Sequence, residues 1–389
     1  MLITLSQEGD FLMNILLINV METTAPGGIN TTVRETAKYI SLANHCVTVL
    51  QANSLNLRSE EILNGFKIIR VNSNFEKYLF GINPAIYRYL KDNLKLLSPD
   101  IIHVHGIHSL LSSEAIFTIR IFDKKTPIVF SPYLDISRST FLGKYLWDHY
   151  LPIIGIKSFK KVNHVISCSN FEADNINCIF GVSSNNISII PLGVDTINLT
   201  KPIKSNSQIN LIYSGYLIKR KSVNHILNGL YSLINDYNIK NVILKIIGDG
   251  PEKKNVINMI KSLNLEDHVI VKSFLPRDEH ISELKKADIL LLLSESEAYG
   301  IVVAETLAQG TPCIVSNNTA LREFTCESGC YGIDYPPDPR KLAQLILNVY
   351  RENPKVGPFS NKIRTWNKVS LDYISTYVEI INNNVSLTN

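Results

Sequence analysis

The chain has 389 residues, a length that favours two domains over one. Hydrophobic residues make up 45% of it and charged residues 19%, which excludes a disordered or low-complexity protein. The formal net charge is +4, and neither half of the chain has the basic excess of a nucleic-acid-binding protein. We therefore expect a globular protein with no nucleic-acid partner.

The six cysteines form no CxxC pair, so the sequence predicts reduced thiols rather than a disulfide framework. Cys326 and Cys330 have no His or Cys partner at the spacing of a zinc site. At the N-terminus, Glu8 and Asp10 precede the apolar run Leu12–Val20, a pattern unlike a secretory signal peptide. Because no apolar run is long enough to span a bilayer, we expect a cytoplasmic protein whose fold begins after an extension of residues 1–12.

Short β-branched runs alternate with longer amphipathic stretches along almost the whole chain. Several of the runs are apolar on both faces, as in a parallel sheet that helices cover on either side. In the first half the predicted strands are Ile15–Val20, Cys46–Gln51, Lys67–Val71, Ile101–His105, Pro127–Ser131, His164–Cys168 and Ile187–Ile190. In the second half they are Ile209–Ser214, Val242–Ile247, Val269–Ser273, Asp288–Leu293, Pro312–Ser316 and Tyr331–Asp334. This pattern predicts an α/β fold that is wound twice.

Helical stretches such as Thr31–Ala43 and Ser222–Asp236 lie between the predicted strands and supply the right-handed crossovers of a parallel sheet. The periodicity breaks at Thr196–Ser207, a polar stretch with one proline, so we place the domain boundary there. The last stretch, Asn361–Asn384, is helical and follows the last strand. The pattern leaves open whether this helix packs on its own domain or crosses back to the first.

The first predicted strand is followed by Gly27 and Gly28, which precede a helix. A glycine pair at this place lets backbone amides approach a phosphate without a Cβ in the way, and a plain tight turn is the alternative. The chain has no GxGxxG motif here, so the pattern does not favour a nicotinamide dehydrogenase.

Three histidines, His103, His105 and His108, lie at the carboxyl end of a predicted strand, where open α/β sheets place their ligands. Strand alternation puts His103 and His105 on the same side of the sheet. A zinc site is one interpretation, but no carboxylate stands at a useful spacing. A hydrogen-bonding histidine in a polar cleft is therefore favoured.

In the second half, the turn after the strand Ile209–Ser214 contains Gly215 and three consecutive cations, Lys219, Arg220 and Lys221. Three cations at a strand end can neutralise a diphosphate, and a solvated turn is the alternative. The next turn, Gly-Asp-Gly-Pro at 248–251, is expected to serve backbone geometry, with its proline opening the following helix.

The most informative segment is 294–312, in which Glu297 and Glu305 are eight residues apart. Glu297 is predicted in the loop after a strand, and a helix is predicted to begin near Gly300. Free backbone amides at 300–303 then form a positive helix end that can hold phosphate. Glu305, one turn into that helix, can accept hydrogen bonds from ribose hydroxyls, while Glu297 faces the group beyond the phosphates.

Taken in order along the chain, these motifs resemble those of the GT4 family of retaining glycosyltransferases. The resemblance covers nearly the whole chain, and its most specific part is the pair Glu297 and Glu305 with Tyr299-Gly300 between them. It implies an α/β fold of the GT-B type, in which two Rossmann-like α/β/α domains face each other across a cleft. The implied acceptor-side domain spans residues 13–200 and is completed by a C-terminal helix at about 366–386. The implied nucleotide-sugar-binding domain spans residues 205–365.

The resemblance also implies roles for the residues that match the family's motifs. Glu305 would bind the ribose, Glu297 the donor sugar and Lys221 the diphosphate, and His105 would lie near the reaction centre. The implied catalytic residues are therefore His105, Glu297 and Lys221. The implied donor-binding residues are Gly28, Gly215, Arg220, Lys221, Tyr299, Gly300, Ile301, Val302 and Glu305.

Three positions depart from the family's pattern. Tyr216 stands where an arginine is usual, Ser222 where a glycine is usual, and Leu192 where an asparagine is often found. The arginine would be one of two cations on the leaving diphosphate. We expect Arg220, next to Lys221, to compensate for its loss.

The implied function is transfer of a hexosyl-type sugar from a nucleotide sugar to a glycan or lipid-linked acceptor, in cell-surface polysaccharide or glycolipid synthesis. A helix end and Lys221 would stabilise the departing diphosphate without a metal or another cofactor, and the chain has no Asp-x-Asp motif. The basic and aromatic residues 138–161 are expected to touch an anionic membrane peripherally, a packed helix pair being the alternative. A catalytically impaired partner subunit and a sugar-nucleotide epimerase are the competing functions.

Overall fold

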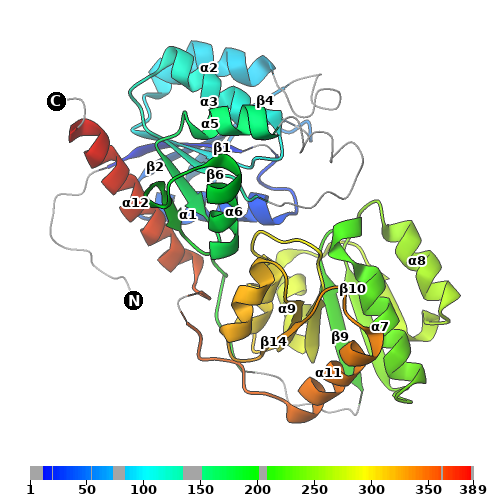
Figure 1. The fold of residues 1–389 in the computed structure, drawn as a ribbon. Coiled ribbons are helices and arrows are strands. Elements are labelled where there is room, and N and C mark those ends of the chain that lie inside the picture. Colours follow the sequence, from blue (N-terminus) through cyan, green and yellow to red (C-terminus); the bar gives the residue numbers. More distant parts are fainter. Residues whose placement is uncertain are drawn as a thin grey trace.

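The computed structural model describes residues 12–19, 21–53, 55–72, 84–134, 151–200, 208–360 and 362–386. Over these residues the chain forms two α/β units, each built around a mainly parallel sheet (Figure 1). Every strand predicted from the sequence is present, with ends that differ by at most one residue.

The first sheet has eight strands in the order β3-β4-β2-β1-β5-β6-β7-β8, and all its pairings are parallel except that of β3 with β4. Its strands are β1 (Asn14–Asn19), β2 (Cys46–Ala52), β3 (Glu60–Leu63), β4 (Phe66–Val71), β5 (Ile101–His105), β6 (Ile128–Ser131), β7 (His164–Ser167) and β8 (Ile187–Ile189). Both faces are buried, because Ile15 and Leu17 pack with one set of apolar side chains and Leu16 and Ile18 with another.

The edge strand β3 was not predicted from the sequence. It is a short strand of half-exposed and exposed residues that pairs antiparallel with β4 through the turn Asn64-Gly65. Both turn residues have positive φ, 49° for Asn64 and 93° for Gly65. An Asn-Gly pair between two short runs is the signal that would have identified this hairpin.

The second sheet has six strands, all parallel, in the order β11-β10-β9-β12-β13-β14. Its strands are β9 (Ile209–Ser214), β10 (Val242–Ile247), β11 (Val269–Lys272), β12 (Ile289–Leu292), β13 (Cys313–Ser316) and β14 (Cys330–Ile333). The order reverses between β9 and β12, and open α/β sheets place ligands beyond the carboxyl ends of such neighbouring strands.

Helices connect the strands in both units. They are α1 (Gly28–Leu42), α2 (Pro84–Leu97), α3 (Leu110–Phe122), α5 (Ile156–Phe159), α6 (Asn170–Phe180), α7 (Val223–Asn235), α8 (Lys253–Ser262), α9 (Arg277–Lys286), α10 (Ile301–Ala308), α11 (Pro339–Glu352) and α12 (Trp366–Ser386). Two short 3₁₀ segments, η3 (Lys219–Lys221) and η5 (Ala320–Cys326), border the candidate site described below. The predicted helix at 31–43 begins three residues earlier, at Gly28, and the last helix begins at Trp366 rather than at residue 361.

The C-terminal helix α12 lies against the first unit, beside α1 (Figure 1). The Tyr377 hydroxyl lies 2.6 Å from His103 Nδ1 of β5, in a fully buried contact. At the start of the helix, Trp366 is fully buried and its backbone N–H donates to Val194 O at 3.0 Å. Of the two placements that the sequence left open, the structure has the helix that crosses back.

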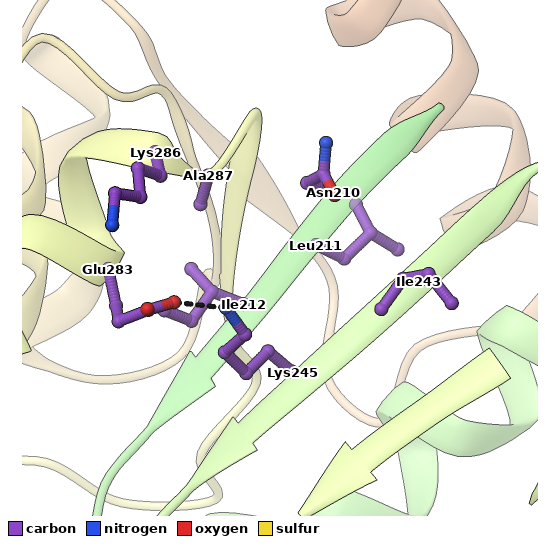
Figure 2. A pocket seen from close by; sticks show the side chains of 8 residues that line it. All are labelled: Asn210, Leu211, Ile212, Ile243, Lys245, Glu283, Lys286 and Ala287. Atoms are coloured by element: carbon purple, nitrogen blue, oxygen red, sulfur yellow. Dashed lines mark hydrogen bonds and ion pairs between the residues drawn. The ribbon is translucent and has the colours of Figure 1, made fainter. Parts of the chain in front are cut away.

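A small pocket lies between α9 and the strands β9 and β10 (Figure 2). Its lining includes Asn210 and Ile243, which are close to the amino ends of their strands, and the ion pair of Lys245 with Glu283. Since ligands of such sheets bind at the carboxyl ends of the strands, this pocket is not the candidate site.

Candidate functional site

The N-terminus of α10 follows the loop after β12, as the sequence predicted. Gly300 precedes the helix with a φ of +95°, and a Cβ at this position would overlap the Leu321 side chain. Among the residues that the structure describes, no side chain caps this helix end. The first amides of α10 therefore remain available to an anion, with the positive end of the helix dipole behind them.

The two turns that carry the predicted catalytic groups of the second unit meet in one cluster. Lys221 Nζ forms an ion pair and hydrogen bond with Glu297 Oε1, and Ser294 Oγ donates to the same carboxylate oxygen at 3.0 Å. Arg220 binds the same loop, because its Nη1 donates to Ser296 O at 3.1 Å. The cations after β9 and the loop after β12 thus form a single polar surface beside the α10 helix end.

Glu305 is buried inside the second unit and is paired there with a residue that the sequence analysis did not single out. Arg277, the first residue of α9, places Nη1 2.7 Å from Glu305 Oε1 and Nε 2.7 Å from Asp195 Oδ2. Burial raises the pKa of Glu305, and Arg277 opposes that rise. No sequence signal linked Arg277 to Glu305, since the two residues belong to different helices and no motif spans them.

The glycines of the second unit's turns serve backbone geometry. A Cβ on Gly248 would overlap the carbonyl oxygen of Gly215, and one on Gly250 would overlap that of Leu217. The two turns also exchange backbone hydrogen bonds, from Gly215 N to Ile247 O at 3.0 Å and from Leu217 N to Asp249 O at 2.8 Å. Gly248 and Gly250 therefore let the turn that carries the cations lie directly on its neighbour.

The departures from the family's pattern have distinct structural settings. Ser222 adopts the left-handed conformation, with a φ of 52°, in which a glycine is unstrained, and its Oγ lies 3.0 Å from the Tyr335 hydroxyl. Tyr216 is exposed beside Phe274, with ring centroids 5.5 Å apart. Leu192 uses its backbone carbonyl, which accepts from the Tyr299 hydroxyl at 3.2 Å, so this contact does not depend on its side chain.

The first unit presents its glycine pair to the second unit. A Cβ built on Gly28, the first residue of α1, would lie 3.8 Å from Ile301 Cγ2 at the start of α10. The N-termini of α1 and α10 therefore approach each other from opposite units. Two helix ends that face one another concentrate positive potential in the space beside them.

The predicted histidine His105 is fully buried, and its Nδ1 lies 3.1 Å from the Tyr133 hydroxyl. Its ring is close to that of His103, with centroids 4.0 Å apart, which confirms that the two side chains share one side of the sheet. Burial lowers the pKa of His105 to about 3, so the ring is uncharged at neutral pH. His108 is exposed at the turn after β5, and its Nε2 lies 2.9 Å from Tyr133 O.

The histidines do not form a metal centre in the described part of the chain. Both ring nitrogens of His103 face hydroxyl groups, those of Tyr377 and Ser131. Within the described ranges, no group of three or more His, Cys, Asp or Glu side chains is arranged to hold a metal ion. No helix among those residues is long and apolar enough to cross a bilayer.

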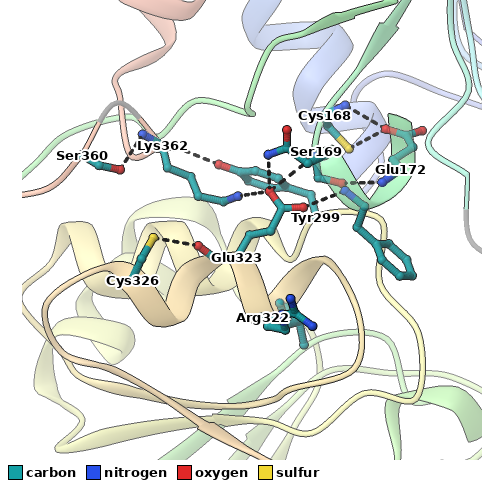
Figure 3. Close-up of polar contacts among 12 residues, drawn as sticks. Cys168, Ser169, Glu172, Tyr299, Arg322, Glu323, Cys326, Ser360 and Lys362 are labelled. Carbon is teal, nitrogen blue, oxygen red and sulfur yellow. Dashed lines mark hydrogen bonds and ion pairs between the residues drawn. The ribbon is translucent and has the colours of Figure 1, made fainter. Parts of the chain in front are cut away.

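The loop that carries Glu297 also contacts the first unit (Figure 3). Ser169 Oγ donates to Ala298 O at 2.7 Å, and the buried Tyr299 hydroxyl donates to Lys362 O at 3.1 Å. The carboxylate of Glu323 accepts from Phe171 N at 2.8 Å and so caps the N-terminus of α6. The contacts of Ser169 with Ala298 and of Phe171 with Glu323 hold the loop after β12 and the 3₁₀ segment η5 against the edge of the first unit.

Two family comparisons together cover most of the chain. Residues 26–197 match the family described as Glycosyltransferase Family 4, and residues 196–366 match the family described as Glycosyl transferases group 1. The two facing α/β units and these matches define the chain as a GT-B protein. It belongs to the GT4-type glycosyltransferases.

Among curated proteins, the chain is 34% identical over 111 residues to N-acetyl-alpha-D-glucosaminyl L-malate synthase of Bacillus anthracis, covering 28% of each chain. It is 25% identical over 232 residues to MMP alpha-(1->4)-mannosyltransferase of Mycolicibacterium hassiacum, covering 57% of this chain and 55% of that one. The chain thus spans about a quarter and about half of the lengths of these two relatives.

Solved structures of the same fold align over nearly the full chain. Sucrose-phosphate synthase from Thermosynechococcus elongatus aligns with a TM-score of 0.72 at 17% identity, covering 96% of this chain and 98% of that one. HepE of Anabaena, solved in complex with UDP and glucose, aligns with a TM-score of 0.66 at 15% identity, covering 97% and 99%. At these identities the alignments establish the fold.

Proposed function

We propose that this protein transfers a hexosyl-type sugar from a nucleotide-sugar donor to a glycan or lipid-linked acceptor, with retention of configuration and without a metal. The observation that carries the proposal is the convergence of three features. The Lys221–Glu297 pair, the uncapped helix end at Gly300 and the buried Glu305 all lie at the carboxyl ends of β9 and β12. HepE was solved in complex with UDP and glucose, and one of the curated relatives named above is by name a mannosyltransferase, which supports a nucleotide-sugar donor.

In the proposed reaction, the bond between the sugar's anomeric carbon and the diphosphate oxygen breaks. Negative charge then develops on the diphosphate, and the amides of Ile301 and Val302, with Lys221 and Arg220, would stabilise it. The acceptor hydroxyl forms the new bond on the same face of the sugar, and its proton passes to the leaving phosphate oxygen. Glu297, held by Lys221, would bind hydroxyls of the sugar, and Glu305 those of the ribose.

On the acceptor side we propose that Gly28 borders the diphosphate and that His105 supports the reaction centre. Because the His105 ring is buried and uncharged at neutral pH, it would act as a neutral hydrogen-bonding group. A direct contact with the sugar would require the groups that cover the ring, Tyr133 among them, to move. His108 is exposed at the turn after β5, with its Nε2 2.9 Å from Tyr133 O.

We place the enzyme in cell-surface polysaccharide or glycolipid synthesis, on the cytoplasmic side of a membrane. The peripheral contact proposed for residues 138–161 falls largely outside the described residues, which omit 135–150. Flotation with anionic liposomes at low and high salt tests it, since a contact made by lysines and arginines weakens as salt rises. Salt-independent flotation, or none, would contradict this contact.

A nucleotide panel tests the donor site. We expect one of UDP, GDP, ADP or CMP, or a sugar derivative of it, to raise the melting temperature of the unaltered chain. At a hundredfold excess over Kd, binding adds about 2.7 kcal/mol to the unfolding free energy. Glu305→Ala is expected to lose most of this shift, while Glu352→Ala, a change on the exposed face of α11, should retain it. A nucleotide shift that survives Glu305→Ala unchanged would refute the assigned ribose contact.

Arg220→Ala tests whether this arginine supplies the positive charge that is missing because Tyr216 stands where the family usually has an arginine. Arg220 is already attached to the Glu297 loop through Ser296 O, so its charge is held near the proposed diphosphate. We expect turnover to fall about tenfold, the equivalent of 1.4 kcal/mol in the barrier. Unchanged turnover, measured as release of the nucleoside diphosphate, would mean that Arg220 does not compensate.

Tyr216 also motivates a second candidate function, a partner subunit that has lost catalysis. Both glutamates and Lys221 remain in place in this structure, which favours the enzyme. If no nucleotide stabilises the unaltered chain, the partner function becomes the better account. A sugar-nucleotide epimerase would instead be identified by its product, an isomerised nucleotide sugar formed without any acceptor.

A further inference from the structure

Arg277 connects three parts of the second unit. Its Nη1 lies 2.7 Å from Glu305 Oε1 on α10, and its Nε lies 2.7 Å from Asp195 Oδ2 in the segment that joins the two units. Its Nη2 is buried with no hydrogen-bond partner among the described residues. A guanidinium can hold two carboxylates in this fixed fork, which a lysine ammonium cannot reproduce.

The elements around Arg277 are tied together independently of it. Gln309 Nε2, after α10, donates to Thr196 O at 3.1 Å, and Asn198 N donates to Ala308 O at 2.7 Å. One turn further along α9, His280 Nε2 lies 2.8 Å from Ser214 Oγ. Ser214 is the last residue of β9 and directly precedes Gly215, where the turn that carries the three cations begins. The first turn of α9 is therefore held against both the carboxyl end of β9 and helix α10, which carries Glu305.

Glu305 depends on a cation, because its carboxylate is almost wholly withdrawn from water. The charged groups that act on it are Arg277 from α9, Asp195 from the connecting segment and Arg34 from α1. Asp195 disfavours the carboxylate and the two arginines favour it. Of the two arginines, Arg277 is the one in direct contact, so it is the group that most opposes the burial-driven rise in the pKa of Glu305 and that fixes the orientation of its carboxyl group.

We propose that Arg277 is a positioning residue of the donor site, which holds Glu305 as an oriented carboxylate toward the ribose of a nucleoside diphosphate. This inference rests on the proposed function. Arg277 acts through Glu305, and removing it leaves a buried carboxylate that takes up a proton and loses acceptor capacity. Ribose recognition then weakens, while the contacts to the diphosphate remain.

The test compares Arg277→Met and Arg277→Lys with the unaltered chain, using UDP, GDP or ADP, whichever the panel identifies, and its 2′-deoxy form. For Arg277→Met we expect about tenfold weaker binding of the ribonucleotide, equivalent to 1.4 kcal/mol, and a loss that grows as the pH falls, because the pKa of Glu305 rises further without the arginine. The preference of the site for the ribonucleotide over its 2′-deoxy form should become smaller than in the unaltered chain. Arg277→Lys should show a smaller loss of affinity and a weaker dependence on pH than Arg277→Met. Arg340→Met, which removes an exposed arginine from α11, is the matched control.

A double-mutant cycle with Glu305→Gln decides whether Arg277 acts through the glutamate. We expect Arg277→Met to cost little further affinity once Glu305→Gln is present, because the group that it positions is gone. Additive losses, or an unchanged ribo-to-deoxyribo preference in Arg277→Met, would overturn the inference. If Arg277→Met does not fold, the cycle is run with Arg277→Lys, whose smaller loss of affinity should likewise be absent once Glu305→Gln is present. A failure of the proposed function is distinguishable, since the unaltered chain would then bind none of the nucleotides.

Discussion

Lys221→Ala is expected to lower the rate of sugar transfer by about 10²–10³-fold, the range seen when one preorganised group that stabilises developing charge is removed. Lys221 Nζ is paired with Glu297 and lies in the turn that faces the α10 helix end. As charge grows on the departing diphosphate, the ammonium group of Lys221 stabilises the transition state more strongly than it stabilises the bound substrate. The effect should therefore appear mainly in kcat, with a smaller change in the affinity for the nucleotide.

Lys219→Ala is the control for this prediction. It removes the same formal charge from the same turn, but Lys219 is exposed and makes none of the contacts that tie Lys221 to Glu297. Its turnover, measured as nucleoside diphosphate released per unit time, should stay within a few-fold of the unaltered chain. Equal losses for the two lysines would point to a general charge effect and refute a specific role for Lys221.

The sheets could be predicted from the sequence because buried parallel strands are short, apolar on both faces and separated by helices. The edge strand β3 escaped this criterion, since all its residues are at least partly exposed and its signal was the Asn64-Gly65 turn. The placement of α12 also lay beyond the pattern. Its buried face shows that it must pack somewhere, but the partner is identified by contacts in the structure, such as that between Tyr377 and His103.

The candidate site could be predicted from the sequence where a single contiguous segment determines the local geometry. The helix end at Gly300 is such a case, because glycine, loop and helix are contiguous. Contacts between distant segments were not predictable: Lys221 meets Glu297 across 76 positions. His105 shows a further limit, since strand alternation gives the side of the sheet but not what covers it, and that side is closed here by Tyr133 and its neighbours.

The buried ion pair of Arg70 and Glu22 leads to the largest expected effect on stability. Both side chains are fully buried, with Arg70 Nε 2.7 Å from Glu22 Oε2 and Nη2 3.1 Å from Oε1. Arg70→Met should lower the free energy of unfolding by about 3–5 kcal/mol, because it strands a buried carboxylate. Chemical denaturation at neutral pH measures this loss. The double variant Arg70→Met with Glu22→Leu should regain part of it, since no buried carboxylate is then left unpaired; Glu61, which also pairs with Arg70, is partly exposed to water.

The Arg70–Glu22 pair also predicts how the loss of unfolding free energy in Arg70→Met depends on pH. Burial alone would raise the pKa of Glu22, but hydrogen bonds from Arg70, Gln51 and Thr24 outweigh it and hold the pKa below its ordinary value. A carboxylate with a lowered folded-state pKa stabilises the protein above its unfolded pKa, and this stabilisation disappears as the pH falls through the folded value. The difference between the unaltered chain and Arg70→Met should therefore be greatest near neutrality and shrink below about pH 4. A difference that stayed constant with pH would show that Arg70 contributes through packing of its stem rather than through its charge on Glu22.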